Sequence, residues 1–292
     1  MALQSRANGE LAHVLGDSKE ASLISFGSGF ILLMVMAAFS PRLRDGLRRI
    51  RGAVTARRLP RWQTLAGLSG AVYVLVQAYT VPLMGVAIFS VATIAGQSTS
   101  SIIVDRMGLR SGVRHHITGR RVMTAVVTVL AVAVSVADRI DGAAGWLALV
   151  AFASGLLVSV QRVLNAHITD YSEHSYATTW LNFATGAAML VGVNLLQQQP
   201  LGSLPTGASA WWMYSGGVLG VVFIALSSVA VQRLGVLMFT VLSVGGQLVG
   251  ALVIDVLYPT PGVHLGVNMF MGIALSLIGV IIGVRPRRPA SA

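Results

Sequence analysis

The stretch that decides the fold is Gly85–Asp105, GVAIFSVATIAGQSTSSIIVD, because the chain contains a second copy of it. Moved along by 150 positions, it matches Gly235–Asp255, GVLMFTVLSVGGQLVGALVID, with seven identities in 21 positions and no gap. Each copy is an apolar run long enough to cross a bilayer, with a Gly-Gln pair past its middle and an aspartate at its end. A buried amide requires a hydrogen-bond partner. The two copies therefore predict a polar site inside a membrane-embedded bundle.

The composition is typical of a membrane protein. Hydrophobic residues make up 54% of the 292 residues and charged residues only 11%, whereas soluble domains are about one quarter charged. The absence of cysteine excludes disulfides and cysteine-ligated metals, and we expect no cofactor and no metal site. The net charge of +11 would also suit a protein that binds nucleic acid. Its arginines flank apolar runs without a recognition module, however, which excludes nucleic acid as a partner.

Nine apolar runs of spanning length are predicted after a polar N-terminal segment. They cover residues 21–40, 62–81, 85–105, 122–136, 146–165, 177–196, 210–231, 235–255 and 265–284. We interpret residues 42–61, which contain eight arginines, as a solvated linker. Pro82, Leu83 and Met84 are expected to form a tight turn between two spans.

The duplication extends over the whole chain. At an offset of 157, Gln4 and Asn8 match Gln161 and Asn165. Further matches are Phe26 with Phe183, Gly29 with Gly186, Trp62 with Trp212, Gly67 with Gly217 and Gly70 with Gly220. We therefore expect two five-helix repeats, residues 1–138 and 146–288, within one integrated membrane domain. The first repeat lacks the residues equivalent to 146–160, so either the true start lies upstream or the first helix is clipped.

An odd number of spans per repeat makes the second repeat enter the membrane from the opposite side. With the N-terminus inside, 17 of the 21 basic residues fall in cytoplasmic segments, and only Lys19 and Arg139 lie in outer loops. Arg6 and Arg162 are placed at helix ends. The predicted fold class is all-α, a polytopic membrane helix bundle of two inverted five-helix repeats, with a substrate site at their interface.

The repeated unit resembles the YdcZ-type, EamA-related branch of the drug/metabolite transporter (DMT) superfamily. The likeness lies in a Gln-x-x-x-Asn first helix, a second helix with Phe and Gly, a Trp-led glycine-rich third helix, and a fourth with Gly-Gln and then Asp. This resemblance implies a ten-helix carrier of the bacterial inner (plasma) membrane that exports a small organic solute, with both termini cytoplasmic. It does not identify the substrate, and it leaves open whether the protein forms a homodimer.

The candidate substrate-binding residues are polar or aromatic side chains within the spans. They are Gln97, Gln247, Tyr73, Gln77, Phe223, Asn8 and Asn165. Gln97 and Gln247 either line a cavity or only join helices by hydrogen bonds. Tyr73, which Phe223 matches in the repeat, shares a helix face with Gln77; the pair would bind a flat or cationic molecule, or else pack between helices. For Asn8 and Asn165, helix capping is the preferred interpretation.

Three acidic residues are candidates for a coupling or gating role. Asp105 and Asp255 end equivalent spans on opposite sides, where we expect solvent-exposed interfacial residues rather than gates. Glu10 is the only acid near a first helix, and in a related small multidrug transporter family a first-helix carboxylate couples transport to protons. The position equivalent to Glu10 holds His167, which argues against that role.

An enzymatic function is not expected. Gly67-Leu68-Ser69-Gly70 matches the G-x-S-G of rhomboid-like proteases, but all six histidines lie in loops or at helix ends, and Leu219 replaces Ser69 in the repeat. The sequence therefore predicts a secondary transporter that works by alternating access, with a non-transporting membrane subunit or scaffold as the alternative.

Overall fold

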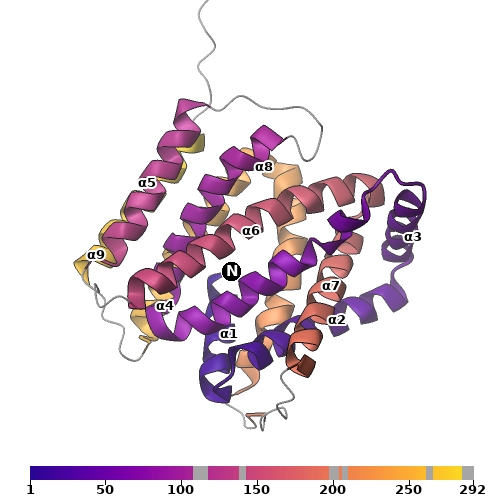
Figure 1. Ribbon diagram of the computed structural model, residues 1–292, viewed down its shortest axis with the longest axis horizontal. Helices are drawn as coiled ribbons and strands as arrows, with labels where there is room; N and C mark the ends of the chain where they lie inside the picture. Colours follow the sequence, from indigo (N-terminus) through magenta and orange to yellow (C-terminus); the bar gives the residue numbers. More distant parts are fainter. Residues whose placement is uncertain (108–117, 138–142, 197–203, 206–209, 261–265, 285–292) are drawn as a thin grey trace, which may run out of the picture.

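The computed structural model describes residues 1–107, 118–137, 143–196, 204–205, 210–260 and 266–284, without the side chains of residues 101, 103–107, 225, 227–238, 240, 241 and 284. Over these residues the chain is helical and contains no strand (Figure 1). The elements are α1 (Ala2–Leu15), α2 (Ser18–Phe39), α3 (Pro41–Thr55), η1 (Arg61–Leu65), α4 (Gly67–Met107), α5 (Gly119–Ser135), α6 (Ala143–Ser172), α7 (Ser175–Leu196), η2 (Trp211–Ser215), α8 (Gly216–Leu257) and α9 (Val267–Val284). The predicted all-α bundle is confirmed.

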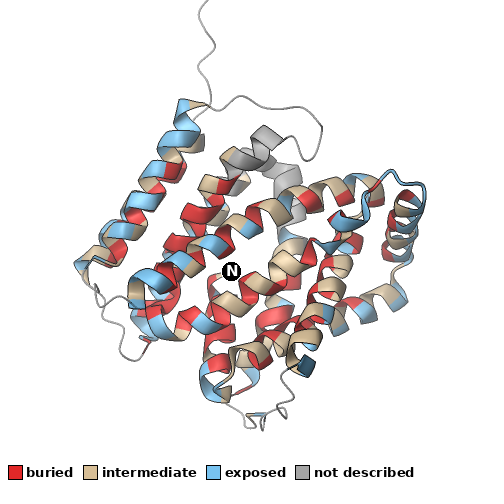
Figure 2. Cartoon of the chain, in the orientation of Figure 1, coloured by how far each residue is buried: buried red, intermediate tan, exposed pale blue. Residues whose placement is uncertain are grey.

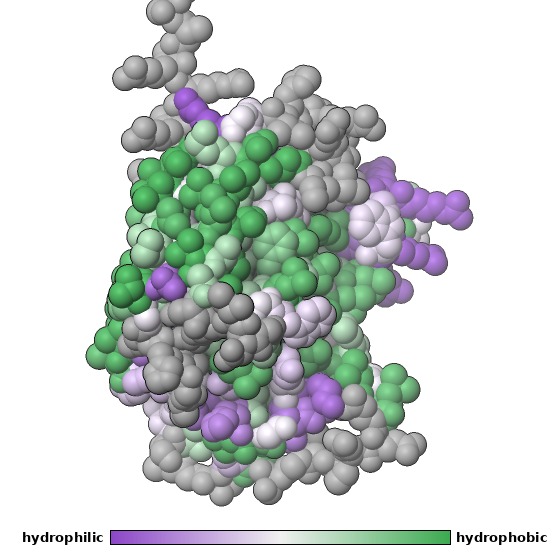
Figure 3. Space-filling model, turned by 60° about the vertical axis from the view of Figure 1, so that its left-hand side comes forward, coloured by the Kyte–Doolittle hydropathy of each residue, from purple (hydrophilic) through white to green (hydrophobic). Residues whose placement is uncertain are grey.

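Much of the outer surface is apolar. Four described stretches are long and apolar enough to cross a membrane: residues 18–39, 61–100, 143–172 and 175–196. α5 and α9 pack together at one edge of the molecule, and α3 lies at the opposite edge (Figure 1). The face over α5 and α9 is predominantly hydrophobic (Figure 3), with exposed side chains such as Leu130 and Phe270. This surface suits contact with lipid.

The centre of the bundle is the second half of α4. α4 is two helices joined at Gly85, whose φ of 84° is a conformation that favours glycine. The predicted tight turn at Pro82–Met84 is therefore wrong in position, because those residues end the first helix and the chain bends at Gly85. Every residue from Met84 to Gln97 is buried, as the red ribbon of Figure 2 shows. Most of these residues are apolar, which is typical of a helix buried on all sides.

The arginine-rich segment after α2 is folded, and the prediction of a solvated linker is wrong. α3 is capped by the Ser40 hydroxyl, which accepts a hydrogen bond from the Leu43 N–H at 3.3 Å. Its apolar side carries Ile50 and Ala53, which belong to one buried cluster with Ile168 of α6. Most of the arginines of α3 lie on its exposed side. The segment is an amphipathic helix packed on the bundle.

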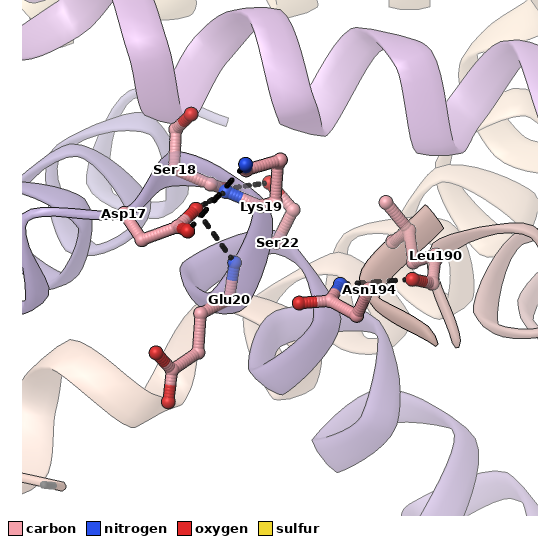
Figure 4. A network of polar contacts seen from close by, with 7 residues as sticks. All are labelled: Asp17, Ser18, Lys19, Glu20, Ser22, Leu190 and Asn194. Carbon is pink, nitrogen blue, oxygen red and sulfur yellow. Dashed lines mark hydrogen bonds and ion pairs between the residues drawn. The ribbon is translucent and has the colours of Figure 1, made fainter. Parts of the chain in front are cut away.

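A capping network starts α2 (Figure 4). Asp17 accepts hydrogen bonds from the backbone N–H groups of Lys19 at 2.7 Å and Glu20 at 3.3 Å, and its carboxylate lies 3.7 Å from Lys19 Nζ. These bonds satisfy amides that have no partner within the helix. α1 ends just before, at Gly16, which has a φ of 68°. The turn between α1 and α2 is thereby fixed.

The two repeats interlock through reciprocal contacts between equivalent residues. The rings of Phe26 and Phe183 have centroids 5.1 Å apart. A Cβ on Gly29 would collide with the Phe183 ring, and a Cβ on the equivalent Gly186 would collide with the Phe26 ring. When residue i meets j and the equivalent of j meets the equivalent of i, the interface has twofold character.

Other glycines of α4 and α8 follow the same rule. A Cβ on Gly67 would collide with the backbone oxygen of Asn182, and one on Gly217 with that of Ser25. Asn182 and Ser25 are 157 positions apart, and Gly217 and Gly67 are 150 apart, as the repeat requires. Close backbone approach through small residues is how helices pack in membranes. These reciprocal pairs confirm the two inverted repeats.

Candidate solute-binding site

A hydrogen-bonded chain joins α1 to α4 in the interior. Asn8 Nδ2 donates to Gln77 Oε1, and Gln77 Nε2 donates to Ser5 Oγ, both at 2.6 Å. The three side chains are at most 1% exposed. The capping interpretation of Asn8 is therefore wrong, because its amide bonds a neighbouring helix. Bonds of this kind hold membrane helices together. Both the oxygen and the nitrogen of the Gln77 amide take part in them.

The second repeat has a related chain between α6 and α7. Gln161 Nε2 donates to Asn182 Oδ1 at 3.0 Å, and Asn182 Nδ2 donates to Asn165 Oδ1 at 2.8 Å. Asn165 is thus no cap either. The two repeats keep amide side chains at equivalent positions but connect them to different partners.

Gln97 and Gln247 both point into protein rather than lipid. They are 8% and 7% exposed. The backbone oxygen of Gln97 accepts a hydrogen bond from Ser159 Oγ at 2.9 Å. Gln247 Nε2 is buried and has no hydrogen-bond partner among the described residues. A contact with solute stays a prediction for both side chains.

Tyr73 brings a hydroxyl to the centre of the bundle. The residue is 5% exposed, and its ring lies 5.6 Å from that of Phe89. The hydroxyl is close to the side chains of Gln77 and Thr93, yet it has no hydrogen bond of acceptable geometry within the described structure. Gln77 already bonds two residues of α1, and the Thr93 hydroxyl donates to a backbone oxygen. Both side chains keep lone pairs that can accept from the Tyr73 hydroxyl, so it belongs to the same polar cluster.

The equivalent position in the second repeat is less polar. Phe223 is partly exposed and has no hydroxyl. Asp105, a candidate gate residue of the first repeat, has its side chain outside the described part of the structure. The two repeats therefore differ in polarity here, because the position of Tyr73 on α4 is held by a phenylalanine on α8.

Arg162 lies within a helix, although the sequence places it at the end of a predicted span. α6 runs on to Ser172, so Arg162 lies ten residues inside the helix. Its repeat equivalent, Ser5, is fully buried and faces α4. Arg162 itself is exposed.

Asp255 occupies a buried position between the repeats, and the expectation of solvent exposure is wrong. It is 1% exposed, and its Oδ1 and Oδ2 accept hydrogen bonds from the N–H groups of Val86 at 3.0 Å and Ala87 at 2.7 Å. These are the first amides after the bend at Gly85, and they have no partner within their own helix. A carboxylate there also complements the helix dipole. Asp255 of one repeat thus caps a helix of the other.

Glu10 takes part in a second bridge between the repeats. Its carboxylate lies 3.0 Å from Arg6 Nη2, and Arg6 Nη1 donates to Thr260 Oγ1 at 3.0 Å. A pocket of about 40 Å³ remains beside them, next to Pro82, which is room for little more than a water molecule. We call this region, with the Asp255 cap, the Pro82 end (residues 6–13, 82–87 and 255–260). Polar contacts between the repeats close it.

The buried side chains described above can form hydrogen bonds. No group of three or more histidine, aspartate and glutamate side chains gathers anywhere in the described part of the chain. The buried polar groups include the Tyr73 hydroxyl and the amides of Gln77 and Gln247. Such groups bind and orient a polar solute.

Comparison with protein families gives one match. The model of the DMT_YdcZ family, described as "Putative inner membrane exporter, YdcZ", matches residues 1–134 and again residues 146–282. No curated protein and no solved structure matches the chain. The two matched ranges contain the two sets of reciprocal glycines and phenylalanines described above. The chain therefore belongs to the YdcZ family of the drug/metabolite transporter superfamily.

Proposed function

We propose that the protein is a secondary transporter that exports a small organic solute by alternating access between its two repeats. The observation that carries this proposal is the set of reciprocal contacts through which the two repeats meet, Gly29 with Phe183 and Gly186 with Phe26. Inverted repeats commonly hold their substrate at such an interface near the midplane. The exporter role of the family supports the direction of transport.

The closed Pro82 end supports alternating access. Opening this end requires Asp255 to leave the amides of Val86 and Ala87, and Arg6 to leave Thr260. Each bond joins the two repeats, so their relative rocking breaks both together. The arginine-rich α3 belongs on the cytoplasmic side by the positive-inside rule. With both termini cytoplasmic, the Pro82 end then faces the outside of the cell. The described conformation is closed on that side.

The test is solute flux into and out of vesicles that contain the purified protein. We expect the wild type to move at least one class of solute, and Gln97→Ala and Gln247→Ala to reduce that flux by about tenfold, a typical loss for a buried hydrogen bond to a ligand. Asn194→Ala is the matched control, because this amide donates only to the Leu190 oxygen of its own helix, at 2.8 Å. Its flux should equal that of the wild type.

A non-transporting membrane subunit or scaffold is the second candidate. One observation favours it: the buried side chains of Asn8, Gln77 and Ser5 bond one another, as amides that only hold helices together do. Absence of flux for every solute class, in a preparation whose thermal unfolding is cooperative, would contradict transport and support this candidate.

A further inference from the structure

We infer that α3 binds anionic phospholipids of the cytoplasmic leaflet through the side of the helix that carries Arg44, Arg48 and Arg51. These three arginines are exposed and follow one another at i, i+4 and i+7, so they share one face of α3. We call this side the arginine face. The inference goes beyond the proposed function, because it gives α3 a partner whether or not the protein transports a solute.

The connections of α3 hold it at the membrane surface. Residues 18–39 and 61–100 are both long and apolar enough to cross a membrane, and α3 lies between them in the sequence. With five arginines among its 15 residues, α3 is too polar to enter the hydrocarbon and lies in the interface plane. Phe39 and Trp62, on either side of it, are 84% and 53% exposed. Exposed aromatic side chains are typical of the headgroup level.

The segment carries more positive charge than the protein neutralises. Residues 42–61 contain eight arginines and one aspartate. Two of the eight form ion pairs, Arg48 with Asp45 and Arg49 with Glu173. The six arginines without an ion pair in the described structure are Arg42, Arg44, Arg51, Arg57, Arg58 and Arg61. A cluster of unpaired basic side chains directly after a span attracts the anionic lipids of the cytoplasmic leaflet.

An open hollow on the arginine face offers a place for the headgroup. Its volume is about 470 Å³, and it is lined by Pro41, Arg44, Leu47 and Arg48. Guanidinium groups bind phosphate oxygens through charge-assisted hydrogen bonds. Arg48 also pairs with Asp45, so Arg44 is the guanidinium of this hollow that lacks a counter-ion in the described structure. Apolar side chains beside the cations favour a lipid over a soluble phosphate, because a lipid also brings apolar surface to bury.

The first experiment is a thermal-shift titration of the full-length protein in a neutral detergent. The probes are dioctanoyl phosphatidylglycerol, zwitterionic dioctanoyl phosphatidylcholine as its matched control, inorganic phosphate and a single-stranded oligonucleotide. A ligand that binds only the folded state raises the melting temperature. We expect a saturable rise with phosphatidylglycerol and none with phosphatidylcholine. The rise should disappear in about 1 M salt, where the Debye length is about 3 Å.

Three results of this titration would overturn the inference. Equal shifts with the two lipids would show that charge is not recognised. A shift with inorganic phosphate as large as that with phosphatidylglycerol would point to a soluble anion. A larger shift with the oligonucleotide would point to nucleic acid.

Variants of the arginine face locate the site. Arg44→Gln combined with Arg51→Gln should weaken phosphatidylglycerol binding by about 10- to 30-fold, because each basic side chain near an anionic surface contributes to binding. Arg44→Lys with Arg51→Lys keeps both charges and should retain most of the binding. The matched control, Arg120→Gln with Arg121→Gln, removes the same charge from the exposed start of α5. Undiminished binding by the α3 glutamine variant, or an equal loss in the α5 control, would refute the assignment to α3.

Melting temperatures without lipid separate binding from folding. Arg44 and Arg51 are exposed and unpaired in the described structure, so their glutamine variant should melt within about 2 °C of the wild type. A larger fall would indicate that these arginines stabilise the fold and would overturn the inference. Absence of solute flux together with intact phosphatidylglycerol binding would refute the proposed function and leave this inference standing.

Discussion

Gly96 and Gly246 hold equivalent positions in the two repeats, yet their surroundings differ. A Cβ on Gly96 would collide with the backbone oxygen of Phe152, because α6 crosses α4 there, and a Cβ on Gly155 would collide with Thr93 in return. Gly246 is exposed, and a Cβ on it would have no neighbour within 4 Å among the described residues. A duplicated motif thus does not by itself give a duplicated helix contact.

The largest expected effect is a difference in the free energy of unfolding between the alanine variants of these two glycines. Gly96→Ala should lower the free energy of unfolding by about 1–3 kcal/mol, because a backbone contact cannot yield to the new methyl group. Gly246→Ala should raise it by up to about 1 kcal/mol, because alanine favours a helix and the methyl group enters open space. Denaturant unfolding of the two variants in detergent measures both changes. Equal losses of stability in the two variants would show that Gly96 and Gly246 are equally constrained by their neighbours.

The symmetric glycines are expected to behave alike. Gly29→Ala and Gly186→Ala each push a methyl group into the phenylalanine ring of the other repeat, and each should cost about 1–2 kcal/mol of unfolding free energy. The rings can rotate, so the loss is smaller than at Gly96. The same unfolding assay compares the two variants. Values that differ by more than about 1 kcal/mol would contradict a true pseudo-twofold contact, since equivalent sites should respond equally.

The smallest effect compares two capping aspartates. Asp255→Asn keeps one acceptor oxygen for two amides of the other repeat and should lower the unfolding free energy by about 1–2 kcal/mol. Asp17→Asn changes a cap within one repeat whose carboxylate is about a quarter exposed, and should cost about 0.5 kcal/mol. Thermal unfolding of both variants tests the difference. A larger loss at Asp17 would argue that the bridge at the Pro82 end contributes little.

The repeat and the apolar runs were enough to predict most of the bundle. Phe26 and Gly29 recur as Phe183 and Gly186, and the structure brings the four together. Local pattern could predict these elements because small residues and spanning length are properties of a single helix. α3 was missed although it repeats its apolar residues with helical spacing, because its arginines outweigh them in hydropathy.

The site was predicted less well, for reasons of tertiary structure. The sequence ends the fifth span of the list at Asn165, but packing against α3 extends α6 to Ser172 and leaves Arg162 well inside the helix. The partner of Asp255 is a pair of backbone amides on another repeat, and a backbone amide has no sequence signature. Gln77 was correctly placed beside Tyr73, but its bonds to α1 depend on how the helices dock.

The reciprocal phenylalanines and glycines bear on how such a protein arises. A five-helix ancestor with one such phenylalanine and one such glycine would offer a self-complementary surface to a second copy inserted upside down in the bilayer. Fusion of two tandem genes would fix that antiparallel pair at equal stoichiometry. From then on the copies could diverge, and a tyrosine or an arginine could evolve in one half without appearing in the other.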